Sequence, residues 1–410
     1  MTYREAEAYL LELELFGMRF GLDRMHRLLT ALGLPQHRFA AVHVVGSNGK
    51  SSTARMLAAL LREGGLRVGT YTSPHLRSFT ERIEVDGEAI DADDFAAAVE
   101  HAAQAAARVD AAADDPEDRV TQFEALTAAA FHALARRGVE LAVVEAGLGG
   151  RHDATNVIAA RVCALTGVGL EHTRWLGDTL GAIAEEKLAV LGDHAVLVTG
   201  ELGPEAEEVA ERVARERRAH RVRVGAGEDL PGRGPFGRRN LAVALAAAAP
   251  FVGTLDPDAV RAAVGDLVLP GRLEEVGRAP LTILDGAHNP AGAHALAEAL
   301  PEVVEGRPLT LVLSVLDDKD AASMLRALAP HATRLVLTTS HHPRSLAPEV
   351  LEGLARAAGA PAAELAPDPR AALERARALA GPEGAVLATG SLYLVADLVG
   401  DPSPGTASIL

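Results

Sequence analysis

The chain has 410 residues, of which 48% are hydrophobic and only 3% aromatic, and its formal net charge is −16 at pH 7. This length allows two domains with large cores, and the composition suits α/β layers packed on Ala, Leu and Val. Few aromatic rings and no visible basic face argue against a nucleic-acid binder. No apolar run is long enough to span a bilayer, and acidic residues occupy the place of a signal peptide's apolar core. We therefore expect a soluble cytoplasmic protein without a membrane or nucleic-acid partner.

In the first half of the chain, helical patterns alternate with apolar strands. Residues 3–32 are expected to form two helices broken near Gly17 and Gly21, followed by a strand at 41–45 and a helix at 54–61. Further on we expect strand 67–72, a hairpin of 82–85 and 89–90 around Asp86-Gly87, helices 94–113 and 122–137, and strands 141–145, 161–167 and 195–199. Continuous apolar strands are typical of a parallel sheet covered on both faces. The single cysteine, Cys163, lies in one of these runs and is expected to be buried and inert.

A break near Leu269-Pro270-Gly271 precedes a second, smaller unit. Beyond it strands are expected at 281–284, 309–315, 334–338 and 385–389, with helices beginning near Ala291 and Ala321. The tail after Gly400 is expected to be mobile. The sequence thus predicts an α/β protein. Residues 1–270 would form a doubly wound, mainly parallel phosphate-loop domain, and residues 271–410 a smaller Rossmann-like α/β domain.

The segment between the strand at 41–45 and the helix at 54–61 reads Gly46-Ser47-Asn48-Gly49-Lys50-Ser51-Ser52. In a phosphate loop the backbone N–H groups point inward, the helix dipole adds positive charge, and a lysine reaches the distal phosphates. The usual pattern is G-x-x-x-x-G-K-[ST], and Val44 stands here in place of its first glycine. A bare G-x-x-G-K can be an ordinary turn, but the strand before it and the helix after it favour a nucleotide phosphate loop.

Other chemistry-bearing residues of the first unit follow strand ends, where doubly wound sheets bind their ligands. Glu145 ends an apolar strand beside a glycine loop, so it is a candidate magnesium ligand, with a solvated loop acid as the alternative. His172 follows another strand and is either a metal ligand or a structural histidine. Lys187 has the spacing of a helix residue, and periodicity alone makes it a surface lysine.

The second unit places polar residues at a strand-to-helix turn, Asp285-Gly286-Ala287-His288-Asn289-Pro290. Asp285 and His288 therefore occupy a position that faces ligands. For part of the turn the alternative is a helix cap, with Asn289 as N-cap ahead of Pro290. Because clefts between domains commonly hold ligands, a nucleotide bound by one unit could be closed over by the other.

These segments belong to a longer series of motifs. The series comprises LGLDRM, HVVGSNGKSS, YTSPHL, TQFE, VVEAGLGGRHDATNV, EHT, EKLAV, PGRLE, LDGAHNP, DDKD and ATGSLYLV. Through these motifs most of the chain resembles the folylpolyglutamate synthase/dihydrofolate synthase family of the ATP-dependent Mur-ligase superfamily. Any one of them is weak, whereas all of them in the same order are highly specific.

The resemblance implies a nucleotide and metal site. It implies ATP binding by Ser47, Asn48, Gly49, Lys50, Ser51, Ser52, Asn240, Arg272 and Asp285. Magnesium, as two ions, would be bound by Ser73, Glu145 and His172, together with Lys187 carried as a carbamate. This role would override the surface-lysine interpretation of Lys187. Lys50, Lys187 and His288 would be the catalytic residues, with His288 contributed by a mobile second domain.

The resemblance also implies the acceptor and the reaction. A pterin pocket would be lined by Asp23, Arg24, Thr121, Gln122, Phe123, His152, Asp153 and Ala154. The carboxylate of dihydropteroate or folate would attack the γ-phosphate of ATP, and the amine of L-glutamate would then displace phosphate. The protein would act as a monomer on these small molecules.

The sequence departs from the family pattern at two places, and two alternative functions remain open. Ser51 stands where the family usually has glycine, as in the related cell-wall ligases, so which of Ser51 and Ser52 faces magnesium is open. Leu188-Ala189 follows Lys187 where the family often has Ala-Gly.

The first alternative is a cell-wall amino-acid ligase. Such a ligase would need an N-terminal nucleotide-sugar domain, and the roughly 45 residues before the phosphate loop are too few for one. The second alternative is a nucleotide-binding regulator without ligase activity. The choice between dihydropteroate, folate and both stays open.

Overall fold

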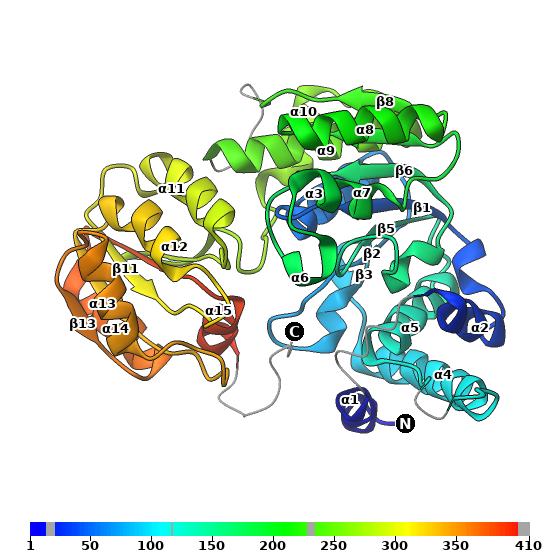
Figure 1. The fold of residues 1–410 in the computed structure, drawn as a ribbon, viewed down its shortest axis with the longest axis horizontal. Coiled ribbons are helices and arrows are strands. Elements are labelled where there is room, and N and C mark those ends of the chain that lie inside the picture. The colour runs from blue at the N-terminus through cyan, green and yellow to red at the C-terminus, as the bar shows by residue number, and fades with distance from the viewer. Residues whose placement is uncertain (14–20, 116–117, 228–233, 401–410) are drawn as a thin grey trace.

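The structure is a computed structural model that describes residues 1–13, 21–115, 118–227 and 234–400. Two α/β lobes lie side by side, each built on one sheet (Figure 1). The blue-to-green lobe carries an eight-stranded sheet and the yellow-to-red lobe a six-stranded sheet. The predicted α/β class is therefore confirmed. The break expected near Gly17 and the tail after Gly400 lie outside the described residues.

The first sheet has the strand order β4-β3-β2-β5-β1-β6-β7-β8. Its strands are β1 (Ala40–Val45), β2 (Val68–Tyr71), β3 (Ile83–Val85), β4 (Glu88–Ala89), β5 (Leu141–Glu145), β6 (Ala160–Leu165), β7 (Val196–Thr199) and β8 (His220–Arg223). Strands β2 and β5 to β8 run parallel to the central β1, whereas β3 and β4 are antiparallel additions at one edge. The carboxyl ends of β5, β1 and β6 therefore meet at one place.

Helices cover both faces of this sheet. They are α1 (Tyr3–Glu12), α2 (Asp23–Ala31), α3 (Lys50–Glu63), α4 (Ala92–Ala111), α5 (Gln122–Arg136), α6 (Thr173–Leu176), α7 (Leu180–Leu188), α8 (Pro204–Glu216), α9 (Gly234–Val252) and α10 (Pro257–Gly265), with 3-10 turns η1 (Pro35–His37), η2 (Phe79–Arg82) and η3 (Ala154–Val157). Because side chains alternate along a strand, Val42 and Val44 of β1 pack against α3 and α9. Ala41 faces the helices α1, α2, α4 and α5, and Val45 faces α7 and α8. Cys163 is buried on that same side, as predicted.

The second sheet has the order β13-β12-β11-β14-β10-β9, with β9 antiparallel to the rest. Its strands are β9 (Glu274–Arg278), β10 (Leu281–Leu284), β11 (Leu309–Leu313), β12 (Arg334–Leu337), β13 (Ala363–Leu365) and β14 (Ala385–Thr389). Its helices are α11 (Pro290–Val304), α12 (Ala321–Leu328), α13 (Pro348–Ala357), α14 (Pro369–Ala380) and α15 (Leu392–Val399), with the 3-10 turn η4 (Ala329–His331). Helices α11 to α13 cover one face, and α14 and α15 cover the other.

The lobes meet where α9 of the first lies beside α11 of the second (Figure 1). Arg238 pairs with Glu302 at 2.9 Å, and Arg239 pairs with Glu298 at 3.1 Å. Below these ion pairs, Leu76 of the loop after β2 is buried in the apolar cluster of the second lobe that includes Val395. We call these contacts, together with one amide pair described below, the seam.

The element boundaries differ from the prediction at informative places. The helix expected from Ala54 begins at Lys50, because the polar residues after Gly49 form its first turn. The edge strands β8, β9 and β13 were not predicted, since they are short and carry many polar side chains. Such strands present no continuous apolar run for periodicity to detect.

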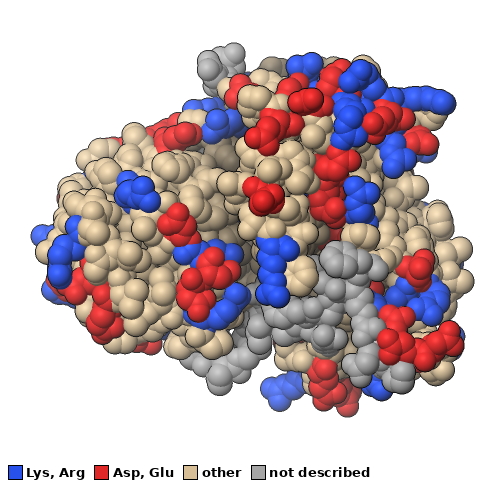
Figure 2. Space-filling view, viewed as in Figure 1, with Lys and Arg blue, Asp and Glu red and all other residues tan. Residues whose placement is uncertain are grey.

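The visible surface carries acidic and basic side chains intermixed, without an extended basic patch on this face (Figure 2). Within the described ranges, no single helix is both long and apolar enough to cross a membrane. Only α9 and α10 taken together satisfy that criterion, and they are bent by 116° relative to each other.

Candidate active site

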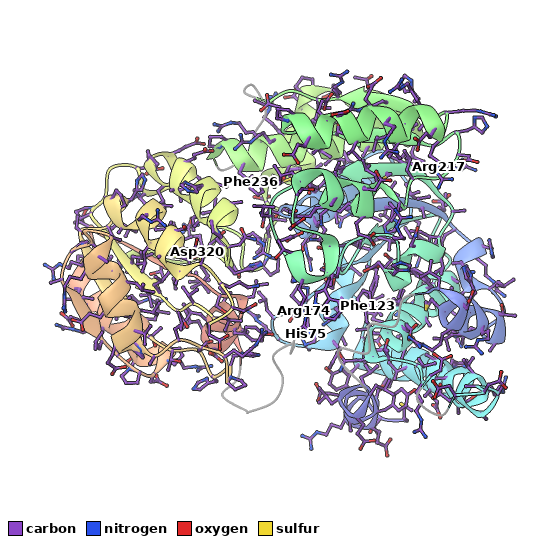
Figure 3. All side chains as sticks on the ribbon, in the orientation of Figure 1. His75, Phe123, Arg174, Arg217, Phe236 and Asp320 are labelled. Atoms are coloured by element: carbon purple, nitrogen blue, oxygen red, sulfur yellow. The ribbon has the colours of Figure 1, made fainter. Side chains whose placement is uncertain are left out.

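One cleft of about 1630 Å³ runs along the carboxyl ends of the central strands of the first sheet and is closed on its other side by the second lobe. Most residues singled out from the sequence line it. They are Ser47, Asn48, Gly49, Lys50, Ser51, Ser52, Ser73, Glu145, His172, Asn240, Arg272, Asp285 and His288, with Arg24, Thr121, Gln122, Phe123, His152, Asp153 and Ala154 farther along. Figure 3 shows Phe123 and Arg174 on the first-lobe side and Phe236 close to the seam. Asp23 is exposed in the first turn of α2 and does not line the cleft.

The phosphate loop is tightly constrained. At Gly46 (φ +150°) a Cβ would lie 2.0 Å from Thr166 Oγ1, and at Gly49 (φ +83°) it would lie 2.5 Å from Asn240 Oδ1. Only glycine fits such positions. Thr166 donates to the carbonyl of Asn48 at 2.6 Å, and Lys50 Nζ donates to the carbonyl of Gly46 at 2.9 Å. The loop is thus held from below by Thr166 and Asn240, with the Lys50 ammonium folded back over it.

Glu145 is buried at the end of β5, directly beside this loop. Its carboxylate accepts hydrogen bonds from the Ser51 hydroxyl at 2.8 Å and from the Ser73 backbone N–H at 3.1 Å. Burial raises the pKa of Glu145, and the charge of Lys50 and these hydrogen bonds oppose that rise. Of the two serines left open by the sequence, Ser51 is the one that contacts Glu145.

Lys187 is not the surface lysine that periodicity indicated, because only 1% of it is exposed. Its Nζ donates to the carbonyl of Gly46 at 2.9 Å and to Glu171 Oε1 at 2.8 Å. Burial lowers the pKa of Lys187 to about 8, against the attraction of Glu171. Lys187 does lie in a helix, α7, as its spacing predicts, but this face of the helix packs behind the phosphate loop. Lys187 therefore supports the loop from outside the cleft wall.

His172 precedes α6 with a left-handed backbone (φ +45°), and burial lowers the pKa of its imidazole. Glu171 beside it has a lowered pKa, since Lys50 and Lys187 outweigh its burial. Within the described ranges, no group of three or more His, Cys, Asp or Glu side chains is arranged to hold a metal alone. A single buried carboxylate with nearby hydroxyls fits magnesium, which usually keeps waters and takes further ligands from phosphates.

The second lobe contributes the turn after β10. Asp285 accepts from the backbone N–H groups of Leu273 at 2.9 Å and Ala287 at 2.8 Å. Burial raises the pKa of Asp285, and Arg272 opposes this. The His288 Nδ1 lies 2.8 Å from the carbonyl of Gly286, and burial lowers the pKa of this histidine to about 4. A carbonyl only accepts, so Nδ1 carries the proton and Nε2 is a free lone pair.

The same turn connects the two lobes. Asn289 caps α11 by accepting from the Gly292 N–H at 2.8 Å, as the sequence suggested. Its Nδ2 also donates to Asn48 Oδ1 of the phosphate loop at 3.1 Å. This amide pair, the last member of the seam, links the phosphate loop directly to the second lobe.

The far end of the cleft is lined by a separate group of buried polar side chains. Thr121 and Glu124 form a capping box at the start of α5, and Arg24 donates to Glu124 at 2.7 Å. Arg24 also binds Asp118 at 2.5 Å, so this arginine holds α2 against α5. Phe123 packs across Gly147, where a Cβ would lie 2.6 Å from its ring. Asp153 is buried in the lining of the same pocket.

Several cleft residues were missed from the sequence. Arg82 is 2% exposed and donates to His75 Nδ1 at 2.9 Å. Lys319 and Arg344 line the second-lobe wall, with Asp318 at 3.0 Å from Lys319. One signal was available for Lys319, because the chain has only three lysines and many arginines. All three lysines lie at or directly behind this cleft.

A phosphate loop beside a buried acid, facing an Asp-His turn on a second α/β lobe, defines an ATP-dependent ligase of the Mur-ligase type. Residues 271–392 match the family described as Mur ligase, glutamate ligase domain. The chain is 38% identical to a dihydrofolate synthase/folylpolyglutamate synthase of Mycobacterium tuberculosis, over 82% of this chain and 77% of that protein.

It is also 37% identical to a probable bifunctional folylpolyglutamate synthase/dihydropteroate synthase of Haloferax volcanii, over 97% of this chain but only 50% of that longer protein. The solved Mycobacterium tuberculosis folylpolyglutamate synthase complexed with ADP superposes with a TM-score of 0.88 at 34% identity, covering 96% of each chain. The chain belongs to the folylpolyglutamate synthase/dihydrofolate synthase family.

Proposed function

We propose that this protein is an ATP-dependent ligase that joins L-glutamate to the carboxylate of dihydropteroate, of a reduced folate, or of both. One observation carries the proposal: a single cleft connects the phosphate loop and Glu145 to the pocket of Phe123 and Asp153 and is closed by the second lobe. The names of the relatives and the ADP complex of a similar structure support it. The domain division is part of the proposal, with residues 1–270 binding ATP and residues 271–410 forming the glutamate-ligase domain.

The nucleotide would lie between the lobes. Its phosphates would contact the N–H groups of the phosphate loop and Lys50, and its adenosine would lie toward Asn240, Arg272 and Asp285. The acceptor carboxylate attacks the γ-phosphorus, ADP leaves, and an acyl phosphate forms. Lys50 stabilises the charge that develops on the transferred phosphoryl group.

Glu145, Ser73 and His172 would hold magnesium, and the bound ion would neutralise phosphate charge. Ser51 orients the Glu145 carboxylate through its hydroxyl. Lys187 is proposed to carry a carbamate that binds a second magnesium ion. Its burial supports this, since a lowered pKa makes the neutral amine accessible, and that is the form that reacts with carbon dioxide.

In the second step the glutamate amine attacks the acyl carbon, phosphate leaves and an amide forms. His288 offers a neutral Nε2 that can accept a proton from the amine. Lys319 and Arg344 place positive charge on the same wall, which suits the two carboxylates of glutamate. Closure of the lobes would exclude water, which would otherwise hydrolyse the acyl phosphate.

The decisive experiment measures ADP formation with ATP, magnesium and five mixtures: glutamate without an acceptor, glutamate with dihydropteroate, glutamate with tetrahydrofolate, and each of the two acceptors without glutamate. Turnover that requires both glutamate and one acceptor, with an amide product of the expected mass, supports the proposal. Turnover with neither acceptor, or turnover independent of glutamate, contradicts it. We further propose that the protein acts as a monomer in the cytoplasm, which sedimentation and fractionation would check.

A further inference from the structure

His43 lies in the middle of β1 and belongs to none of the groups described above. Its side chain is 0% exposed, and its neighbours along the strand are apolar. The ring Nε2 lies 2.8 Å from Thr155 Oγ1 of η3, and that hydroxyl makes a short hydrogen bond to Asp153 Oδ1. A hydrogen-bonded series, His43–Thr155–Asp153, therefore connects the centre of the sheet to the wall of the acceptor pocket.

The hydrogen bonds of this series have one consistent donor-to-acceptor direction, from His43 through Thr155 to Asp153. Asp153 Oδ1 accepts from the Thr155 N–H at 3.0 Å, and Oδ2 accepts from the Leu148 N–H at 2.8 Å, so the carboxyl group is surrounded by donors. A threonine hydroxyl has a single proton. If that proton points to Asp153, Thr155 must accept its other hydrogen bond, and the Nε2 of His43 must be the donor.

The other ring nitrogen of His43 supports the same direction. Within the described part of the chain, His43 Nδ1 has no hydrogen-bond partner. A proton on Nδ1 would leave a buried N–H without an acceptor, which is the costlier and rarer kind of unsatisfied group. It would also turn the Thr155 hydroxyl toward the bare Nε2 and away from Asp153. The Nε2–H tautomer avoids both penalties.

We propose that His43 is a positioning residue, which as its Nε2–H tautomer fixes the Thr155 hydroxyl toward Asp153 so that the acceptor meets an ionised, oriented carboxylate. The acceptor side of this inference rests on the proposed function. Oδ1 already accepts two hydrogen bonds and Oδ2 one, so an ionised Asp153 can accept one further N–H donor, from the heterocycle of the acceptor, at Oδ2. Burial raises the pKa of Asp153, and the hydrogen bonds from the donors around the carboxyl group oppose that rise.

The first test reads the tautomer directly and does not depend on activity. In protein labelled with ¹⁵N-histidine, the signal that disappears in His43→Gln is assigned to His43. We expect its two nitrogens to show the shifts of a neutral Nε2–H ring. A neutral ring protonated at Nδ1, or a charged ring, at neutral pH would overturn the proposal.

The second test separates positioning from packing. His43→Phe keeps a ring without the donor, Thr155→Val keeps the shape without the hydroxyl, and His43→Gln places an amide N–H near the original Nε2. Loss of one hydrogen bond corresponds to about a fivefold change, so each of the first two variants should raise the acceptor KM about fivefold at an unchanged ATP KM. His43→Gln should restore most of the acceptor KM.

The double variant His43→Phe/Thr155→Val decides the matter. If the two residues act in series, the acceptor KM of the double variant should be no higher than that of Thr155→Val alone. If they act independently through packing, the two increases in KM should multiply. Multiplied effects, or ATP and acceptor KM rising together, would contradict the proposal. If His43→Phe does not fold, Thr155→Val and the tautomer measurement still test it. Wild-type protein that turns over no acceptor would instead refute the proposed function and leave the tautomer result standing.

Discussion

The interior of the first lobe and the seam between the lobes hold their polar groups in different ways. Behind the phosphate loop, Glu145 and Lys187 are 1% exposed and each has partners from its own lobe. At the seam, the ion pairs of Arg238 and Arg239 involve glutamates that are about half exposed. The interior is therefore preformed in one lobe, whereas the two ion pairs of the seam are contacts that water can replace.

This difference has an energetic meaning. Removing one partner from a buried charged group leaves an unpaired charge and costs several kcal/mol, whereas an exposed ion pair contributes about 0–1 kcal/mol. We therefore expect the groups behind the phosphate loop to stay fixed while the lobes separate to exchange substrates.

Lys50→Ala should have the largest effect. We propose that the Lys50 ammonium contacts the transferred phosphoryl group, and removing such a donor is expected to lower kcat by about 10²–10³-fold, with a melting temperature close to the wild type. Arg217→Ala is the control, because it removes a cation far from the cleft (Figure 3). Near-normal turnover of Lys50→Ala would exclude this loop as the nucleotide site.

Glu145→Gln keeps the size of the side chain but removes the buried charge. We expect kcat to fall by about 10²-fold and the magnesium titration to shift to higher concentration. Glu140→Gln is the matched control, since Glu140 is an exposed acid just before the other end of β5 and binds the Arg67 N–H. An unchanged magnesium titration for Glu145→Gln would make this residue only a support for Ser51 and Ser73.

Lys187→Ala should lose most activity, and a short carboxylic acid should restore part of it by replacing the carbamate. If Lys187 acted only as a hydrogen-bond donor to the Gly46 carbonyl, Lys187→Ala would lose activity as well. A carboxylic acid could not replace that donor, so it would not restore activity. Rescue therefore distinguishes the two roles. Electron density showing an unmodified lysine in active protein would contradict the carbamate.

His43 provides a test of interior burial through pH. Burial lowers its folded pKa to about 3, below the ordinary value of 6.5. The unfolded state then binds more protons between these values, so stability falls as pH drops below 6.5. Comparing wild type with His43→Gln by denaturant unfolding, the difference in unfolding free energy should change by about 2 kcal/mol between pH 7.5 and pH 5. A constant difference would mean that His43 binds protons equally in the folded and unfolded states, so that burial does not keep it neutral.

The sequence predicted the sheet strands and the cleft residues at strand ends well, because apolar runs and glycine turns are local signals. Periodicity alone predicted wrongly that Lys187 is exposed. The spacing in α7 identifies a helix, but it does not show which other segment packs against each face of that helix. Glu171 and Arg82 were missed because their roles depend on contacts that form only in the folded chain, with Lys187 and His75 respectively. His43 was hidden for the same reason, since inside an apolar strand it looks like a core residue until Thr155 of η3 lies beside it.

The smallest effect is expected at the seam. Asn289→Ala removes both the α11 cap and the contact with Asn48, so its stability loss of about 1 kcal/mol has to be separated from its effect on the nucleotide. Asp320→Ala is a matched control, because Asp320 caps α12 in the same lobe and does not line the cleft. Both variants should lose similar stability, whereas only Asn289→Ala should raise the ATP KM, by about fivefold, since one hydrogen bond contributes about 1 kcal/mol. Small-angle scattering should show ATP compacting the wild type more than Asn289→Ala. If both variants keep the wild-type ATP KM, the amide pair does not link the phosphate loop to closure of the lobes.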